Sequence, residues 1–161
     1  MIVTAGAVRR AGEALLREHL PAKLAEMADA EGLPLPEPRS WSRLADFTTI
    51  AEHQSPAVVV TTPGISEVLP SAGCRAQVAT WQLRVFVVVR GRTYEETADR
   101  VAAYTAAVRS VLLEARRLEG FSASVTWAGE TYQELSADDA RTVGAGSVTV
   151  NYPGVQTGTS T

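Results

Sequence analysis

The chain has 161 residues, of which 45% are hydrophobic and 20% are charged, and its formal net charge is −3. Tight binding to duplex nucleic acid depends on clustered Lys and Arg side chains, so this acidic balance argues against that function. Cys74 is the only cysteine, which excludes an intramolecular disulfide and is typical of a chain assembled in a reducing cytoplasm. The first residues lack a signal-like apolar core, and no apolar run reaches the roughly 18 residues of a membrane span, so we expect a soluble chain.

The N-terminal segment predicts a helix from about Ala5 to Ala30, because apolar residues recur there at helical spacing. The stripe consists of Val8, Leu15, Leu16, Leu20, Leu24 and Met27. Pro21 interrupts the pattern, so either the helix kinks at this residue or two helices meet there. Prolines at alternate positions then predict an extended connector over Leu33–Pro38.

The segment after this connector is less regular. Trp41–Gln54 carries apolar residues at intervals of three, which fits a short helix or an irregular segment. Ala57–Thr62 predicts a short buried strand that ends at Pro63-Gly64, and Ile65–Gly73 is interpreted as a loop.

An unusually long strand is predicted over Gln77–Arg90, on the order of 45 Å against the usual 17–20 Å. One of its faces is apolar and is expected to lie on the core. This face comprises Ala79, Trp81, Leu83, Val85, Val87 and Val89. The other face mixes Arg84 and Arg90 with Phe86 and Val88, so it fits neither solvent nor a core, and we interpret these four residues as a subunit interface.

A second long helix is predicted over Thr93–Arg117. Thr93 and Glu96 form a capping box, and Gly120 stops the helix. Its apolar stripe is expected to pack on the Trp81–Val89 face of the preceding strand. The stripe consists of Ala98, Val101, Tyr104 or Thr105, Val108, Leu112 and Ala115.

The last part of the chain predicts strands over Ser122–Trp127 and Thr142–Tyr152, followed by a flexible tail, Pro153–Thr161. Residues 1–152 are therefore expected to form a single α+β domain. Its sheet would be mainly antiparallel with one long strand, and the long N-terminal helix and the long central helix would cover one face.

The residues that could carry chemistry form no catalytic or metal-binding motif. His19 and His53 have no second ligand at a zinc spacing, and Asp138-Asp139 is more typical of a solvated turn. The glycines of Gly144-Ala-Gly-Ser147 mark a bulge or a close backbone approach within a strand, not a nucleophile elbow. We therefore predict no catalytic residue, no metal and no cofactor. A small hydrolase, the enzymatic alternative, would need His53, Cys74 or Asp139 in one pocket.

A longer pattern carries a family resemblance. Trp81 to Thr97 reads W-x-L-x-V-x-V-x-V-R-G-x-T-x-E-E-T and leads into YTAAVRSVLL at Tyr104–Leu113. Together with the leucine-rich first helix and the closing strands, this pattern resembles the tail terminator proteins of long-tailed bacteriophages, especially those that infect actinobacteria. The resemblance extends from about Ala11 to Tyr152. It provides no set of functional residues to transfer.

The resemblance implies a structural virion protein at the junction of tail and neck, assembled in the host cytoplasm. A homohexameric ring would cap the tail tube protein, bind a neck or head-completion protein, and let genomic DNA pass without specific binding. Acidic residues lining the ring would repel DNA phosphates, and the candidates are Glu95, Glu96, Asp99 and Asp138. The alternatives are a neck stopper or another head-tail connector, and a monomeric binding module.

Overall fold

The computed structural model describes residues 3–43, 50–70, 77–115, 118, 124–138 and 141–156. Its elements are α1 (Ala5–Glu31), β1 (Ser40–Ser42), the 3-10 helix η2 (Glu52–Gln54), β2 (Ala57–Pro70), β3 (Gln77–Gly91), α2 (Tyr94–Glu114), β4 (Thr126–Asp138) and β5 (Arg141–Gln156). The strands follow one another in pairs, β2 with β3 and β4 with β5, and a long helix precedes each such run, as in an α+β chain.

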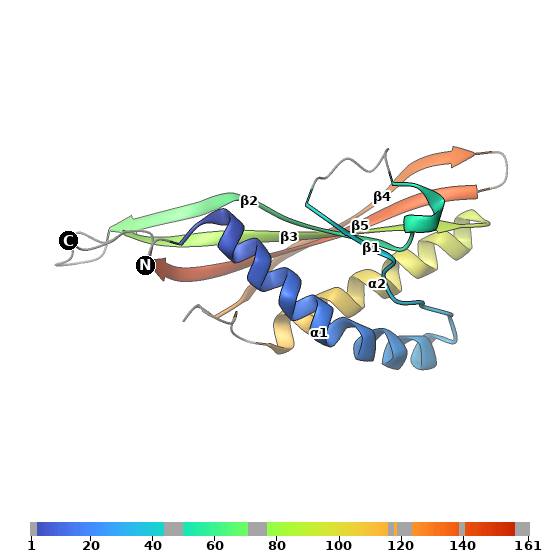
Figure 1. Cartoon of the computed structure of the whole chain (residues 1–161), viewed down its shortest axis with the longest axis horizontal. Coiled ribbons are helices and arrows are strands. Elements are labelled where there is room, and N and C mark those ends of the chain that lie inside the picture. Colours follow the sequence, from blue (N-terminus) through green and yellow to red (C-terminus); the bar gives the residue numbers. More distant parts are fainter. Residues whose placement is uncertain are drawn as a thin grey trace.

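The strands form one five-stranded sheet in the order β1-β2-β3-β5-β4. Only β1 and β2 pair in parallel, and all other neighbours are antiparallel. Both helices lie on the same side of this sheet (Figure 1). The fold class predicted from the sequence is therefore confirmed.

Four of the strands are much longer than the five or six residues that are usual in globular proteins. β2, β3, β4 and β5 have 14, 15, 13 and 16 residues. At one end of the sheet, the end of β2, the start of β3 and the end of β5 extend beyond both helices (Figure 1). The helices thus cover only part of the sheet's length.

The main core lies between the sheet and the helices. The predicted face of β3, from Ala79 to Val89, is buried there together with Leu16, Leu20 and Leu24 of α1. α2 contributes Val101, Tyr104, Ala107, Val108, Val111 and Leu112 to the same cluster. The predicted contact between this helix and β3 is confirmed, except that Ala98 is exposed and its neighbour Thr97 is buried instead.

Two glycines of β5 let α2 come close to the sheet. A Cβ atom at Gly146 would lie 2.1 Å from Thr105 Oγ1, and one at Gly144 would lie 3.1 Å from Thr97 Cγ2. The Thr105 hydroxyl is held in place because it donates a hydrogen bond of 2.6 Å to the Val101 carbonyl. The glycines of this segment therefore mark a close approach, as the sequence predicted.

The start of α2 has the predicted cap. The Glu96 amide donates to Thr93 Oγ1 at 3.2 Å, and the Glu96 carboxylate accepts from the Arg92 amide at 3.1 Å. The helix itself ends at Glu114, whereas the predicted stop at Gly120 lies outside the described residues.

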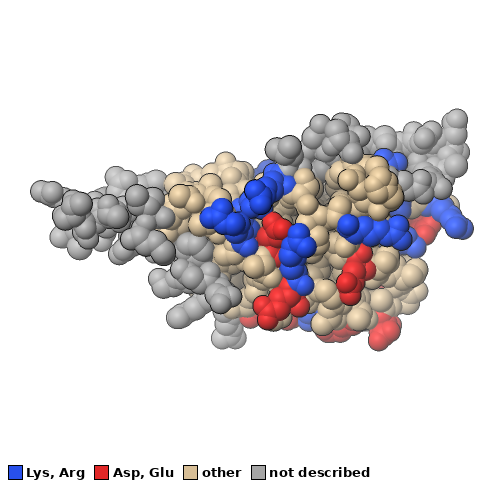
Figure 2. Space-filling model, viewed as in Figure 1, with Lys and Arg blue, Asp and Glu red and all other residues tan. Residues whose placement is uncertain are grey.

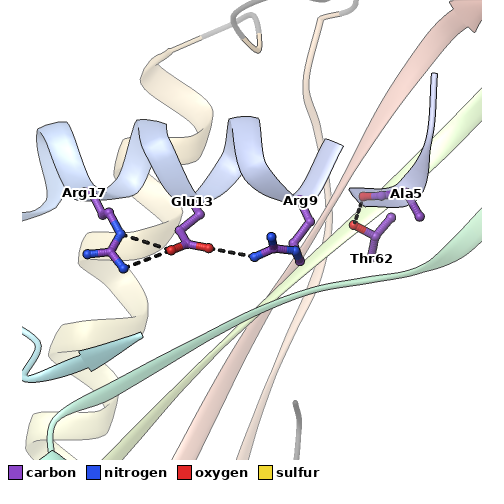
Figure 3. Close-up of polar contacts among 5 residues, drawn as sticks. All are labelled: Ala5, Arg9, Glu13, Arg17 and Thr62. Atoms are coloured by element: carbon purple, nitrogen blue, oxygen red, sulfur yellow. Dashed lines mark hydrogen bonds and ion pairs between the residues drawn. The ribbon is translucent and has the colours of Figure 1, made fainter. Parts of the chain in front are cut away.

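α1 is one continuous helix with Pro21 inside it, so the chain does not divide into two helices at that residue. Its N-terminus is capped by Thr4, whose side chain accepts from the Ala7 amide at 3.1 Å. Thr62 of β2 donates its hydroxyl to the Ala5 carbonyl at 3.1 Å, which attaches the start of the helix to the sheet (Figure 3). Gly32 ends the helix with a left-handed φ of 65°.

The predicted end of β2 is wrong, because the strand continues through Pro63-Gly64 to Pro70. The pairing with β3 shifts register between Thr61 and Gly64, which is the mark of a bulge. A proline needs no ladder hydrogen bond at a bulge, and Gly64 takes a φ of 156° there. Residues 65–70 of the predicted loop are consequently strand, and residues 71–73 lie outside the described part.

The boundaries of other elements also differ from the prediction. Trp41–Gln54 contains the last two residues of β1 and all of η2, while residues 44–49 lie outside the described part. β4 begins at Thr126 and runs eleven residues past the predicted end, in a stretch where the sequence shows little apolar alternation. β5 continues into the expected tail, as far as Gln156, which pairs with Val78.

Candidate assembly surfaces

The second face of β3 is covered over only part of its length. Thr80, Gln82, Arg84 and Phe86 are half-buried, whereas Val88 is 0% exposed. Val88 belongs to a second apolar cluster, and Phe86 packs against that cluster. Its buried members are Ile50, Ala57, Val59, Val88, Val143 and Ala145. The second face of β3 is thus buried in a small apolar cluster at Val88 and partly open to solvent from Thr80 to Phe86.

Arg84 and Phe86 line a depression of about 370 Å³ on the open part of this face. β4 and β5 provide the other walls, including Thr131 and Thr149. Arg84 Nε donates to Thr149 Oγ1 at 3.1 Å, which holds the guanidinium against the sheet. The interface role of Arg84 and Phe86 stays a prediction, and both side chains retain surface that a partner could contact.

Val88 and Arg90 have other partners within the subunit. The complete burial of Val88 leaves it no surface for another chain in this conformation, so its interface assignment needs correction. The alternating pattern missed this because the cover comes from Ile50, far away in the sequence. Arg90 Nη2 donates to the Ile50 carbonyl at 3.0 Å, and the Arg90 amide donates to Ser55 Oγ at 2.9 Å.

Arg90 also lines a large polar cavity, which we name the arginine pocket. Its volume is about 560 Å³, and it lies where the end of β3 meets the start of α2 and the connector before β1. Its charged residues are Arg39, Arg90, Arg92, Glu96 and Arg100. Four arginines against one glutamate leave three net positive charges here, in a chain whose total is −3. The sequence did not reveal this cluster because its residues come from three separate segments.

The four candidates for a lumen lining differ in their surroundings. Glu95 and Asp99 are exposed on α2. Glu96 is paired with Arg100 at 2.9 Å and belongs to the arginine pocket. Asp138 is the last residue of β4, and its side chain is not among those described. Their role in a lumen stays a prediction.

An apolar groove lies between α2 and β4, with a volume of about 310 Å³. Two tyrosines line it and are largely exposed, Tyr94 at 60% and Tyr132 at 57%. Burial raises the Tyr132 pKa, and so does the hydrogen bond of 2.8 Å that it donates to Glu130. The sequence analysis missed this groove, because β4 was not predicted beyond Trp127.

A charged contact joins β4 to α2 beside the groove. Arg109 of α2 pairs with Glu130 at 2.7 Å, and the Glu130 side chain is only 9% exposed. The Arg109 guanidinium also lies 5.4 Å from the ring centre of Trp127, a residue that is 53% exposed. These contacts hold the edge strand against the helix layer.

A row of charges on α1 faces β1 and β2 (Figure 3). The Glu13 carboxylate accepts from Arg9 at 2.7 Å and from Arg17 at 2.9 Å, and Arg17 stacks over Trp41 at 4.7 Å. Burial by itself raises the Glu13 pKa, but the hydrogen bonds and charges of Arg17 and Arg9 outweigh it and lower the pKa overall. The row fixes α1 against the edge of the sheet.

The residues considered for chemistry do not form a site in the described part of the chain. His19 and His53 are both exposed, and Cys74 and Asp139 lie outside it, so the pocket that a hydrolase would need stays untested. Ser147 is buried and shares a hydrogen bond with Thr131. Among the described residues, no three His, Cys, Asp or Glu side chains gather as a metal site would require. None of the described helices is long and apolar enough to cross a membrane.

No protein family model matches the chain, and no curated protein matches it. One solved structure similar to it is a chain from the virion of a native gene transfer agent particle, with 12% sequence identity and a TM-score of 0.48. The similarity covers 88% of this chain and 94% of that chain. A similarity this distant does not define the function of this chain.

Proposed function

We propose that the chain is a structural virion subunit of the tail terminator type, which forms a ring on the tip of a phage tail tube. The observation that carries this proposal is the length of the sheet. Four strands of 13 to 16 residues reach beyond the helices that cover them, so part of the sheet has no helix layer in its own subunit. The sequence resemblance from Trp81 to Thr97 points to the same class of protein.

The edge strand β4 supports self-assembly. Among the described strands, β4 pairs with β5 alone, so one side of its 13-residue backbone has no neighbour in the sheet. Natural proteins usually shorten or cover such an edge, because it invites strand pairing with another chain. Trp127 and Tyr132 on this strand are more than half exposed, and exposed aromatic residues are frequent in interfaces. A neighbouring subunit would cover both the backbone and these side chains.

A ring of this kind would work through its two unlike faces. A tube ring presents a repeating face to which another ring binds, so head-to-tail growth has no intrinsic end. A terminator subunit matches this face on one side only and presents another face to a neck protein. Its flanks close the ring by a heterologous contact, and DNA passes through the lumen without specific binding.

Two measurements test the proposal. Native mass spectrometry with electron microscopy of the purified protein should show closed rings, of six copies if the resemblance holds. In the phage that encodes the chain, an amber mutation should give filled heads beside tubes that are too long and do not join heads.

The genetic experiment separates the alternatives by electron microscopy of the lysate. Tails of normal length attached to heads would reject the terminator role. Free tails of normal length beside heads that leak DNA would instead indicate a neck stopper.

A further inference from the structure

The arginine pocket collects side chains from three parts of the chain. Glu96 and Arg100 are four residues apart in α2 and so share one side of the helix, and Arg92 lies two residues before the helix begins. Arg90 comes from the end of β3, and Arg39 from the residue just before β1. This arrangement brings four guanidinium groups around one cavity.

The charges in the pocket are only partly balanced. The Arg100–Glu96 pair at 2.9 Å is the one ion pair that the described residues make inside it. Arg39 and Arg92 are exposed, and neither forms an ion pair with a described residue. The Nε atoms of Arg90 and Arg100 are buried without a hydrogen-bond partner among the described residues. The exposed guanidinium groups of Arg39 and Arg92 therefore leave the pocket with capacity to bind oxyanions.

The rest of the chain offers matching charges. Because the pocket carries three net positive charges and the whole chain carries −3, the remaining residues carry −6. In the view of Figure 2, acidic side chains dominate the lower edge of the described surface, where Figure 1 places the two helices. Most basic side chains in that view lie above this edge.

One group of carboxylates lies near the other end of α2, and we name it the acidic ridge. It consists of Glu26 and Glu114, whose side chains are 69% and 64% exposed. Glu26 and Glu114 share the ammonium group of Lys23, at 2.9 and 3.1 Å. Two carboxylates around one lysine leave one net negative charge. Glu114 lies 14 residues after Arg100 and 18 after Glu96 along α2, which separates it from the pocket by about 20–27 Å.

We propose that the arginine pocket binds the acidic ridge of a second copy of this chain, and that this contact closes the ring. The inference rests on the proposed function, because it names the surfaces that meet in the assembly. A basic site and an acidic site at opposite ends of one helix allow each subunit to bind the next head to tail, as a heterologous ring requires. Arginine suits this role because its planar fork binds a carboxylate in a bidentate manner.

The form of the pocket favours a protein partner over a small ligand. Small-molecule sites are mostly apolar with a few placed polar groups, whereas this pocket is lined mainly by charged and polar residues. A volume of about 560 Å³ has room for several side chains. A single inorganic ion would leave most of this volume unused.

The experiment reverses charges at the two sites, first separately and then together. Arg39→Glu with Arg92→Glu reverses the pocket, and both side chains are exposed without an ion pair to the described residues, so folding should be kept. Glu26→Arg with Glu114→Arg reverses the ridge. Arg10→Glu with Arg43→Glu is the matched control, because it changes exposed arginines outside the pocket and alters the net charge equally. Native mass spectrometry measures assembly and circular dichroism measures folding.

We expect each reversal alone to weaken assembly by at least about tenfold, equivalent to about 1.4 kcal/mol, and the combined variant to recover it. The control should assemble like the unchanged protein, and assembly of that protein should weaken with added salt. If the unchanged protein forms rings and the pocket reversal assembles as well as the control, the inference is wrong while the proposed function stands.

Two other outcomes would also overturn the inference. If inorganic phosphate binds the pocket and neither reversal affects assembly, the site serves a small oxyanion. If the unchanged protein remains monomeric at every concentration and does not limit tube growth, the proposed function fails, and the contact fails with it.

Discussion

Substitution by aspartate at two positions of β3 should affect folding at one position and assembly at the other. Phe86 and Val88 are two residues apart on one face of the strand, but Val88 is completely buried whereas Phe86 is half-buried beside an open depression. We expect Val88→Asp to unfold the subunit, and Phe86→Asp to leave it folded but hinder assembly.

The magnitudes follow from the burial of each side chain. Removing a fully buried valine forfeits about 1.5–3 kcal/mol. A carboxyl group placed in the same apolar cluster without a partner adds about 1–3 kcal/mol or more. Together these two losses equal much of the 5–15 kcal/mol that is the usual free energy of unfolding of a domain. At Phe86 the new carboxylate reaches water, so only part of an apolar contact is lost, about 1–2 kcal/mol.

Thermal and urea unfolding followed by circular dichroism would measure these differences. A loss of 1–2 kcal/mol in a chain of this length lowers the melting temperature by about 2–8 °C. Phe86→Leu is the control, because it keeps an apolar side chain on the same face. A Val88→Asp variant that melts like the unchanged protein would refute the burial argument. A Phe86→Asp variant that assembles normally would refute the interface role of Phe86.

Three further predictions concern packing, pH and the C-terminal end. Gly146→Ala should destabilise the fold by about 1–3 kcal/mol by overpacking against Thr105, and a double-mutant cycle with Thr105→Ala should show a smaller penalty. Because the folded-state pKa of Glu13 is lowered, its contribution to stability is present above about pH 4.5 and is lost as the pH falls through the folded value. Glu13→Gln should therefore make the free energy of unfolding, measured by circular dichroism, depend less on pH in the acid range. Deleting Val155–Thr161 removes the last two residue pairs of the β3–β5 ladder and should cost about 1–2 kcal/mol in urea unfolding, whereas an unchanged midpoint would mean that these pairs add nothing.

The strongest sequence predictions concern elements whose local pattern and packing agree. The apolar face of β3, from Ala79 to Val89, is buried as predicted, because each alternate residue meets a helix stripe of matching polarity. The cap at Thr93 and Glu96 fixed the start of α2 for a similarly local reason. The sequence predictions were wrong where the same local motif is found in two kinds of structure. Pro63-Gly64 is typical of a turn, but in this sheet it forms a bulge within β2.

The candidate sites show the same division. The sequence identified the mixed polarity of the Arg84–Arg90 face, since that is a property of one strand. It did not show that Ile50 covers Val88, nor that Arg39, Arg90 and Arg100 surround one cavity. Those relations join segments that lie tens of residues apart.

The sequence by itself therefore determined the α+β class, the two long helices, the long strand and its inward face. These properties depend on periodicities of 3.6 and 2 residues, which are written in neighbouring positions. Only the tertiary structure decided the strand order, the lengths of β2 and β4, the apolar groove and the arginine pocket. Sheet pairing and charge clusters depend on distances between remote segments, and no local pattern encodes those distances.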